Sequence, residues 1–413
     1  MSGECDDKNV TSTLGVTGKD FSNTLSTNGW KVTPVSSKKE LIKALEKIAD
    51  TTNKEQPDEL LLDFLVHGSP KTPKHSHAIS LPDCTILHLD DPELTRVLDQ
   101  IKKRKVRMGF LDGSCYAGGS VDAFKKYGCV MASQVKTVET YTDLGKLPSG
   151  KLTYYKGGVT AIKQLLQNDS KVTMDDVYLS TLINDSYNSQ QSNFAVLSDD
   201  GNGTSNAENA AFISHYHDDE SVEQVILSML GYVNDPKFNT KENQENAKFV
   251  KSFLKDYEKK DWFYFLRSDK GRERRLKKKT EKIKCAMPEN AINNLQTTLD
   301  HCENTLDDEK LDQYKALEPT IKKYLRAQIV WSTPEDDKLN PENALARGDL
   351  SYKNQLAVAI ETLGKIKAEN KDGPHDNTLK IKFANAINIL RAYEYLNHKS
   401  KNPSETNCSK FTF

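Results

Sequence analysis

The first half of the chain alternates short, nearly continuous apolar runs with longer segments that are apolar on one side only. Residues 60–66, 106–111 and 129–133 are apolar at almost every position, which is typical of strands buried on both faces of a sheet. By contrast, residues 37–49 and 90–101 repeat apolar side chains every three or four positions, the period of an amphipathic helix. Strand and helix in alternation predict an α/β fold with a mostly parallel sheet and helices on both faces.

Shorter patterns complete this half of the chain. They predict strands at residues 30–35 and 194–197 and helices at residues 159–166 and 175–183. The alternation stops at a polar, glycine-containing stretch over residues 199–206, which we interpret as a domain boundary.

The second half carries helical periods and few strand signals, with loops rich in Pro, Asn and Asp. Helices are predicted at residues 222–232, 246–257, 291–299, 311–324, 355–368 and 377–396. The sequence therefore predicts two domains, an α/β domain at residues 1–203 and an all-helical domain at residues 204–413.

Charge excludes a global attraction for polyanions. The 58 basic and 59 acidic residues leave a formal charge of -1, so any grip on nucleic acid or anionic lipid has to be local. One basic cluster, residues 271–284, holds eight basic and two acidic residues after the aromatic stretch 262–266. A solvated helix face explains this cluster most simply, and binding of anionic lipid or another polyanion is the alternative. The residues that would bind are Arg272, Arg274, Arg275, Lys277, Lys278 and Lys279.

The cysteines and the N-terminus point to a cytosol-like compartment. Seven cysteines, odd in number and without a Cys-x-x-Cys pair, argue against a disulfide framework and against a zinc knuckle, so we expect reduced thiols. No basic stretch followed by an apolar one opens the chain, and no apolar run approaches the length of a membrane span. We expect a cytoplasmic protein without a classical signal peptide or transmembrane segment, with non-classical export left open.

Two of the buried strands end in residues that suit thiol chemistry. Residues 60–66 run into His67 and Gly68, and residues 106–111 run into Asp-Gly-Ser-Cys-Tyr-Ala-Gly-Gly, in which the thiol is Cys115. Reacting groups in parallel sheets lie beyond the C-terminal ends of the strands. A cysteine, with an ordinary pKa of about 8.5, needs a nearby imidazole to become a nucleophile at neutral pH. The N–H groups of Gly68 and Cys115 can then face a developing oxyanion.

His-Gly after one apolar strand, and Asp-x-x-Cys-x-Ala-Gly after a second strand 48 positions later, resemble the caspase, metacaspase, legumain and clostripain group of cysteine peptidases. The resemblance covers about residues 10–200 and includes the helix between the two motifs. It implies a caspase-like fold and a cysteine endopeptidase that works through an acyl-enzyme and is often self-processing. In this reading Cys115 is the nucleophile, His67 is the general acid, and the amides of Gly68 and Cys115 form the oxyanion hole.

The same resemblance directs attention to the substrate pocket. That pocket draws on the residue two before the Cys and on the strand after it. Here the chain departs from the group, because Gly113 stands where caspases have Gln and legumain has Glu. No Arg in the first 95 residues can serve as the basic floor that caspases use for aspartate. Specificity is therefore not carried over, and Gly113, Ser133, Thr137 and Tyr141 are the candidate substrate-binding residues.

Two histidine pairs, His75 with His77 and His215 with His217, are weighed as metal ligands. Neither pair has a partner at ligand spacing and both lie in polar sequence, so we predict no metal, and we place His75 and His77 on a loop beside the cleft. No nucleotide-binding pattern accompanies the Gly pair at 157–158, and no cofactor is expected.

Two other functions stay open. The first is an inactive caspase-like scaffold whose helical half binds a protein partner. The second is a transamidase that passes the acyl group to an amine instead of water.

Overall fold

The computed structural model describes most of the first half of the chain and about half of the second. The described residues are 8–50, 52, 57–69, 76–136, 138, 140, 143–146, 152–155, 157–169, 171–184, 193–200, 203–215, 248, 291–326, 349–369, 377–402 and 408–413. The helix predicted at 222–232 and the basic cluster at 271–284 lie outside them, as does the helix predicted at 246–257 except for residue 248.

A four-stranded sheet forms the centre of the first half. Its strands are β1 (Glu59–Phe64), β5 (Arg107–Asp112), β6 (Cys129–Ala132) and β9 (Val196–Leu197), in the order β1-β5-β6-β9. The pairs β1–β5 and β5–β6 are parallel, and β9 runs antiparallel to β6. The predicted α/β class with a mostly parallel sheet is confirmed.

Alternate side chains of β1 and β5 enter different cores. Met108 and Phe110 of β5 join a smaller core with α2 (Lys38–Ala49) and α3 (Pro92–Lys103), whereas Leu111 points into the larger core on the other face. Because successive residues of a strand face opposite sides, an apolar residue at every position requires helices on both faces.

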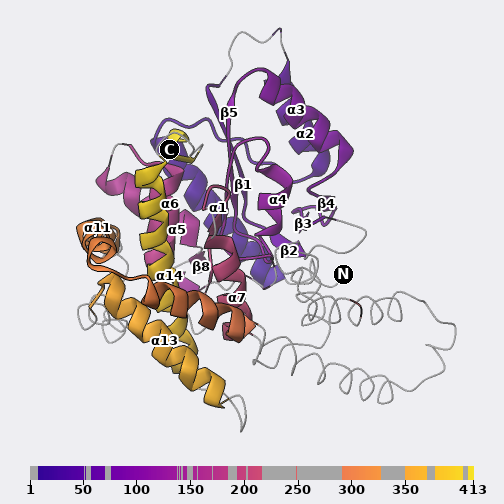
Figure 1. Cartoon of the computed structure of the whole chain (residues 1–413). Helices are drawn as coiled ribbons and strands as arrows, with labels where there is room; N and C mark the ends of the chain where they lie inside the picture. Colours follow the sequence, from indigo (N-terminus) through magenta and orange to yellow (C-terminus); the bar gives the residue numbers. More distant parts are fainter. Residues whose placement is uncertain are drawn as a thin grey trace, which may run out of the picture.

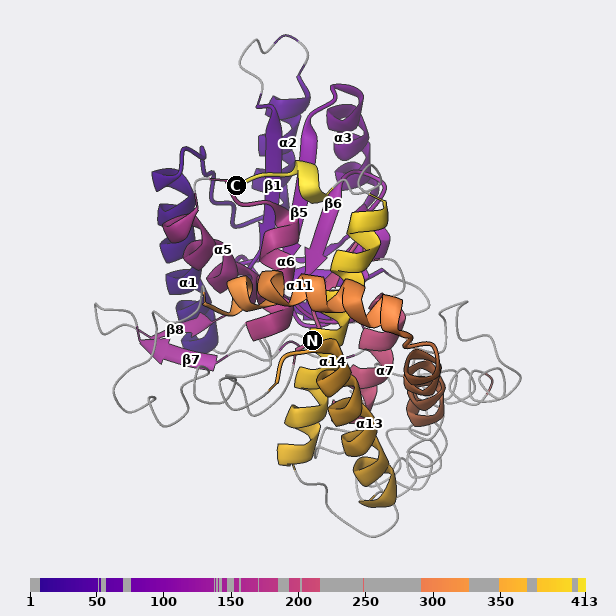
Figure 2. The same cartoon turned by 60° about the vertical axis from the view of Figure 1, so that its left-hand side comes forward.

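Figures 1 and 2 show this layering, with α2 and α3 on one side of the sheet and α1, α5 and α6 on the other. The second group comprises α1 (Lys8–Thr27), α5 (Gly157–Asn168) and α6 (Met174–Asn184). A short helix, α4 (Gly119–Phe124), follows the cysteine motif.

The helix before the cysteine motif begins as its sequence predicts. Asp91 caps α3 by accepting hydrogen bonds from the N–H groups of Glu93 and Leu94, and Pro92 occupies the first turn. Lys38 at the start of α2 forms an ion pair with Asp91 at 2.8 Å, which joins the two helices. These contacts fix the segment that carries the chain from β4 (Ile86–His88) to β5.

Residues 30–35 form no strand, so that prediction is wrong. α1 ends at a left-handed glycine, Gly29 with φ of 87°, after which the N–H of Trp30 bonds back to Leu25. The Trp30 ring then packs near Phe411 and Phe413, with ring centroids 6.0 and 6.4 Å apart. Trp30 therefore packs its side chain against the C-terminus, while the backbone of residues 30–35 joins no sheet.

Helices of the second half pack directly on the first. These are α7 (Gly203–His215), a helix at 291–304, α11 (Asp308–Arg326), α13 (Tyr352–Glu369) and α14 (Asn377–Lys401). The helices predicted at 291–299, 311–324, 355–368 and 377–396 are confirmed. The larger core holds side chains from both sides of residue 203, so the predicted boundary does not separate two cores.

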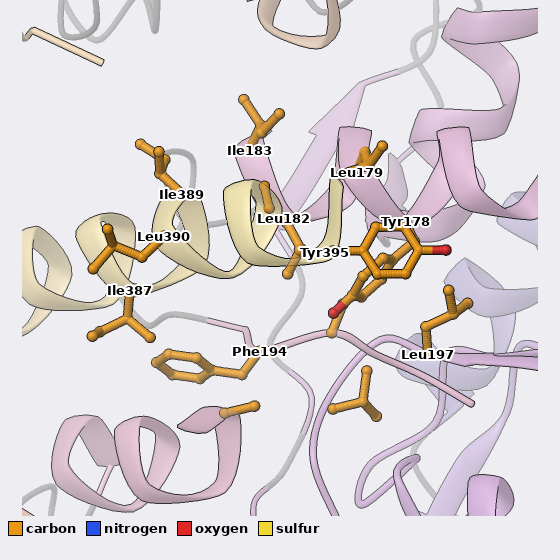
Figure 3. Close-up of a cluster of buried hydrophobic side chains, with 14 of the residues drawn as sticks. Tyr178, Leu179, Leu182, Ile183, Phe194, Leu197, Ile387, Ile389, Leu390 and Tyr395 are labelled. Atoms are coloured by element: carbon orange, nitrogen blue, oxygen red, sulfur yellow. The ribbon is translucent and has the colours of Figure 1, made fainter. Parts of the chain in front are cut away.

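Figure 3 shows α14 lying against α6 and the segment that leads into β9. The rings of Tyr178 on α6 and Tyr395 on α14 meet edge to face, 5.2 Å between centroids. Buried Arg391 donates hydrogen bonds to the Tyr178 hydroxyl at 3.0 Å and to the carbonyl of Ala195 at 2.6 Å. Its guanidinium also lies 3.7 Å from Asp200, so this buried cation is paired.

A disulfide joins the C-terminus to the central sheet. Cys129 of β6 is bonded to Cys408, 279 positions later, at the start of a short 3-10 helix, η5 (Cys408–Lys410). Cys84 is disulfide-bonded as well. The expectation of reduced thiols is therefore wrong for Cys84, Cys129 and Cys408. The cysteines no longer support a cytosol-like compartment. None of the described helices has the length and apolar character needed to cross a bilayer.

The last residues are held by more than the disulfide. Phe413 donates its N–H to Val172 at 2.8 Å, and Met174 donates to Phe411 at 3.1 Å. The Phe411 ring fills the space over Gly109, where an added Cβ would lie 2.6 Å from it. The C-terminal six residues thus close the larger core at the beginning of β5.

Removing this disulfide should destabilise the whole chain. A Cys408→Ser variant is expected to lose about 2–4 kcal/mol of unfolding free energy, because the bond closes a very long loop. Denaturant titration measures the loss, and non-reducing peptide mapping should find the linked pair in the wild type. Cys302→Ser, which breaks no disulfide, is the matched control. Equal stability of the two variants would contradict the assignment.

Candidate active site

Parallel pairing brings the two predicted motifs to one edge of the sheet. Phe64, the last residue of β1, is in register with Asp112, the last residue of β5. Just beyond, Gly113 donates its N–H to the Phe64 carbonyl at 3.1 Å. The chain segments that contain His67 and Cys115 therefore leave the sheet side by side.

His67 begins a second, antiparallel sheet. Its strands are β2 (His67–Ser69), β3 (Ala78–Ser80) and β4 (Ile86–His88). A two-stranded hairpin, β7 (Asp143–Lys146) with β8 (Leu152–Tyr155), lies further along the chain. The sequence patterns predict neither sheet, because strands of three or four residues are too short to show a period.

Gly68 lies directly against the cysteine motif. A Cβ added at Gly68 would lie 2.2 Å from the carbonyl oxygen of Cys115 and 2.6 Å from Oγ of Ser114. Any other residue would collide with this backbone, so glycine is required for the approach. The contact places the backbones of the two expected oxyanion-hole residues, Gly68 and Cys115, next to each other.

Cys115 lies in a loop, half-buried and outside any disulfide. Its sulfur lies 4.0 Å from the carbonyl oxygen of Thr140. Among the described cysteines Cys302 is the other one outside any disulfide, and burial raises its pKa, which favours the unreactive thiol form.

The residue after Cys115 has a strained backbone. Tyr116 adopts φ of 58°, a left-handed conformation that is unusual for a bulky side chain. The ring is 4% exposed, and the N–H donates to the Val138 carbonyl at 3.2 Å, so packing holds the strain in place. Strain of this kind collects at functional sites.

His67 keeps one ring nitrogen without a partner. The residue is partly buried, and its Nε2 is covered from solvent yet forms no hydrogen bond to the described residues. Buried polar atoms without partners are uncommon in folded proteins, and a catalytic role is one of their recognised explanations. His67 therefore has, at the start of β2, a ring nitrogen that makes no hydrogen bond to the described residues.

The predicted substrate pocket is described only in part. Gly113 is buried and Ser133 is 2% exposed, so both are covered in this structure, while Thr137 and Tyr141 lie outside the described residues. Ser133 donates its N–H to the backbone carbonyl of Asp112 at 2.8 Å, and the Ser133 hydroxyl lies 3.4 Å from the Thr140 hydroxyl. Thr140 in turn donates to the carbonyl of Ser114 at 2.5 Å. Thr140 lies between Thr137 and Tyr141 in the sequence and was not among the predicted pocket residues. It contacts the cysteine loop more closely than Ser133 does.

His77 lies in the segment between β2 and β3, as the predicted loop position requires, but its side chain is buried against the cysteine motif. It precedes β3 and is 1% exposed, with Nδ1 2.6 Å from the carbonyl oxygen of Ser69. Its Nε2 lies 3.3 Å from both Asp112 Oδ2 and Ser114 Oγ. The one sequence signal was the apolar pair Ala78-Ile79 after the histidine, which indicates a strand and gives no hint of the partners.

The other histidines of the two pairs cannot be compared with a metal site. His75, His217 and the side chain of His215 lie outside the described residues. Within the part of the chain that the structure describes, no three His, Cys, Asp or Glu side chains gather as metal ligands.

Comparison with known proteins gives no further guide. No protein-family model, curated protein or solved structure matches the chain. The functional argument therefore depends on the residues and on their geometry.

The Gly68 contact can be tested by adding one methyl group. Gly68→Ala should lower the free energy of unfolding by about 1–3 kcal/mol, because its Cβ has no space beside the Cys115 carbonyl. Gly364→Ala in α13 is the matched control, since nothing lies within 4 Å of its added Cβ. That control should gain about 0.5–1 kcal/mol from reduced backbone entropy and better helix propensity. Denaturant unfolding measures both, and a Gly68→Ala variant as stable as the control would refute the contact.

Proposed function

We propose that the chain is a caspase-like cysteine peptidase in which Cys115 attacks the substrate carbonyl and His67 protonates the leaving amine. The observation that carries the proposal is the contact of Gly68 with the Cys115 backbone. It joins the His-Gly and cysteine motifs at the C-terminal ends of neighbouring parallel strands, where α/β proteins place their reacting groups.

The proposed reaction balances with groups of the chain and one water molecule. The Cys115 thiolate adds to the peptide carbonyl carbon, and the N–H groups of Gly68 and Cys115 stabilise the resulting oxyanion. The C–N bond then breaks as His67 gives its proton to the leaving amine, which leaves a thioester on Cys115. Water then adds to the thioester as His67 takes one of its protons, the C–S bond breaks, and release of the acid restores the Cys115 thiolate and the protonated His67.

Two structural features support this assignment over that of an inert scaffold. The left-handed backbone at Tyr116 costs conformational energy at the residue that follows the thiol. The unpartnered Nε2 of His67 costs further free energy beside it. An inert scaffold needs neither the left-handed backbone at Tyr116 nor a His67 nitrogen that lacks a partner among the described residues.

Access to the imidazole requires a movement. Since Nε2 of His67 is covered from solvent, a substrate reaches it only after the covering groups shift. Self-processing, which is common in the group that the sequence resembles, would be one route to such an opening.

Trapping of the thiol tests the proposal. Peptidyl acyloxymethyl ketones ending in Asp, Asn or Arg are incubated with the full chain under mild reduction, and the labelled residue is mapped by mass spectrometry. We expect label on Cys115, none in Cys115→Ala, and a loss of about 100-fold or more in labelling rate or turnover in His67→Ala. Cys302→Ser is the matched control and should label as the wild type does.

The outcomes separate the three functions. If Cys115 stays unlabelled by every probe, or if His67→Ala labels at the wild-type rate, the chain is no peptidase of this kind. Product analysis with and without an added small amine then distinguishes hydrolysis from transamidation, because only a transamidase incorporates the amine into the acyl product.

A further inference from the structure

A buried cluster of His77, Asp112 and Ser114 lies beneath the cysteine loop. The side chains of His77 and Asp112 are fully shielded from solvent, and Ser114 is 0% exposed. Asp112 also accepts the N–H of Ser114 at 2.8 Å. The Asp112 carboxylate is therefore used internally and does not face a substrate.

The hydrogen bonds of His77 define where its protons lie. Nδ1 is 2.6 Å from the Ser69 carbonyl oxygen, which can only accept, so Nδ1 carries a proton. Nε2 faces a carboxyl oxygen at 3.3 Å, and that contact is attractive only with a proton between the two atoms. Both side chains are fully buried, where such an interaction is stronger than at the surface.

The cluster does not have the geometry of a catalytic Ser-His-Asp triad. In a triad the serine and the carboxylate bind opposite ring nitrogens. Here both Asp112 and Ser114 lie at Nε2, and no substrate reaches a hydroxyl that is 0% exposed.

His77 instead connects the two halves of the proposed dyad. Through Nδ1 it holds Ser69, two residues after His67 in β2, and through Nε2 it holds Ser114, the residue before Cys115. Gly119, just beyond the cysteine, leaves room for it, since an added Cβ there would lie 2.4 Å from the Cβ of His77.

We propose that His77 is a positioning residue, which through Asp112 and Ser114 fixes the loop of Cys115 relative to His67. The inference rests on the proposed function and adds to it the residue that sets the dyad geometry. Its Nε2 side controls the thiol, and its Nδ1 side controls the β2–β3 hairpin.

Two substitutions separate the two sides of the ring. The amide nitrogen of Asn stands near the position of Nδ1, so His77→Asn keeps the bond to Ser69 and loses Asp112 and Ser114. The amide of Gln reaches the position of Nε2, so His77→Gln keeps the contacts to Asp112 and Ser114. Each variant is made in the full chain and alkylated with iodoacetamide across a range of pH, and the rates at Cys115 and Cys302 are followed in the same sample.

The proposal predicts a slower Cys115 in only one variant. His77→Asn should lower the alkylation rate of Cys115 by about 10-fold or more, the usual scale for loss of an orienting partner. His77→Gln should restore most of that rate, and Cys302 should be unchanged in both. Cys302 reports on folding, since a loosened structure exposes this half-buried thiol and speeds its alkylation.

Two results would overturn the inference. One is a wild-type rate at Cys115 in both variants, and the other is faster alkylation of both thiols, which means that His77 only supports the fold. Failure of the proposed function looks different, because then Cys115 of the wild type reacts no faster than Cys302 and does not respond to His67→Ala.

Discussion

The parallel pairing of β1 with β5 is the constraint on which the candidate site depends. It brings two segments 48 positions apart to one sheet edge, with Phe64 in register with Asp112. The glycine at position 68 then allows the backbones to touch, and the buried His77 holds them at that distance. Each step needs the one before it, because neither a small residue nor a hydrogen bond can join loops that the sheet has not already brought together.

The helices of the second half contribute side chains to the larger core of the first half. α14 covers α6 and the segment before β9, and the disulfide of Cys408 fastens the C-terminus to β6. One continuous core on this face means that the sheet with the candidate site depends for its stability on the far end of the chain, including Cys408, 279 positions after its partner Cys129. The hydrogen bonds from Arg391 to Tyr178 and Ala195 fix the position of α14, because a buried guanidinium is stable only where its N–H groups are paired.

The sequence predicts the elements well and their connections poorly. Apolar runs such as 106–111 and helical periods such as 90–101 are set by local burial, so they can be recognised without a partner. Trp30 was assigned to a strand because an apolar segment shows that it is buried and not what it packs against. The Cys129–Cys408 pairing and the His77–Asp112 contact arise from tertiary folding, and neither leaves a local pattern. At the candidate site, His67, Gly68 and Cys115 are predicted because each comes just after an apolar strand pattern. Thr140 and His77 follow no such pattern, and their contacts with the cysteine loop arise only from folding.

A reactive thiol and a disulfide place opposite demands on the surroundings of one chain. The thiol is lost by oxidation, and the disulfide is lost by reduction. Exchange requires that a thiolate reach a sulfur atom, and Cys129 and Cys408 are 1% and 0% exposed, whereas Cys115 is half-buried. A mild reductant therefore reaches Cys115 well before it reaches the disulfide. The same molecule can keep Cys115 reduced and its C-terminus tethered, because the two sulfur sites differ in access.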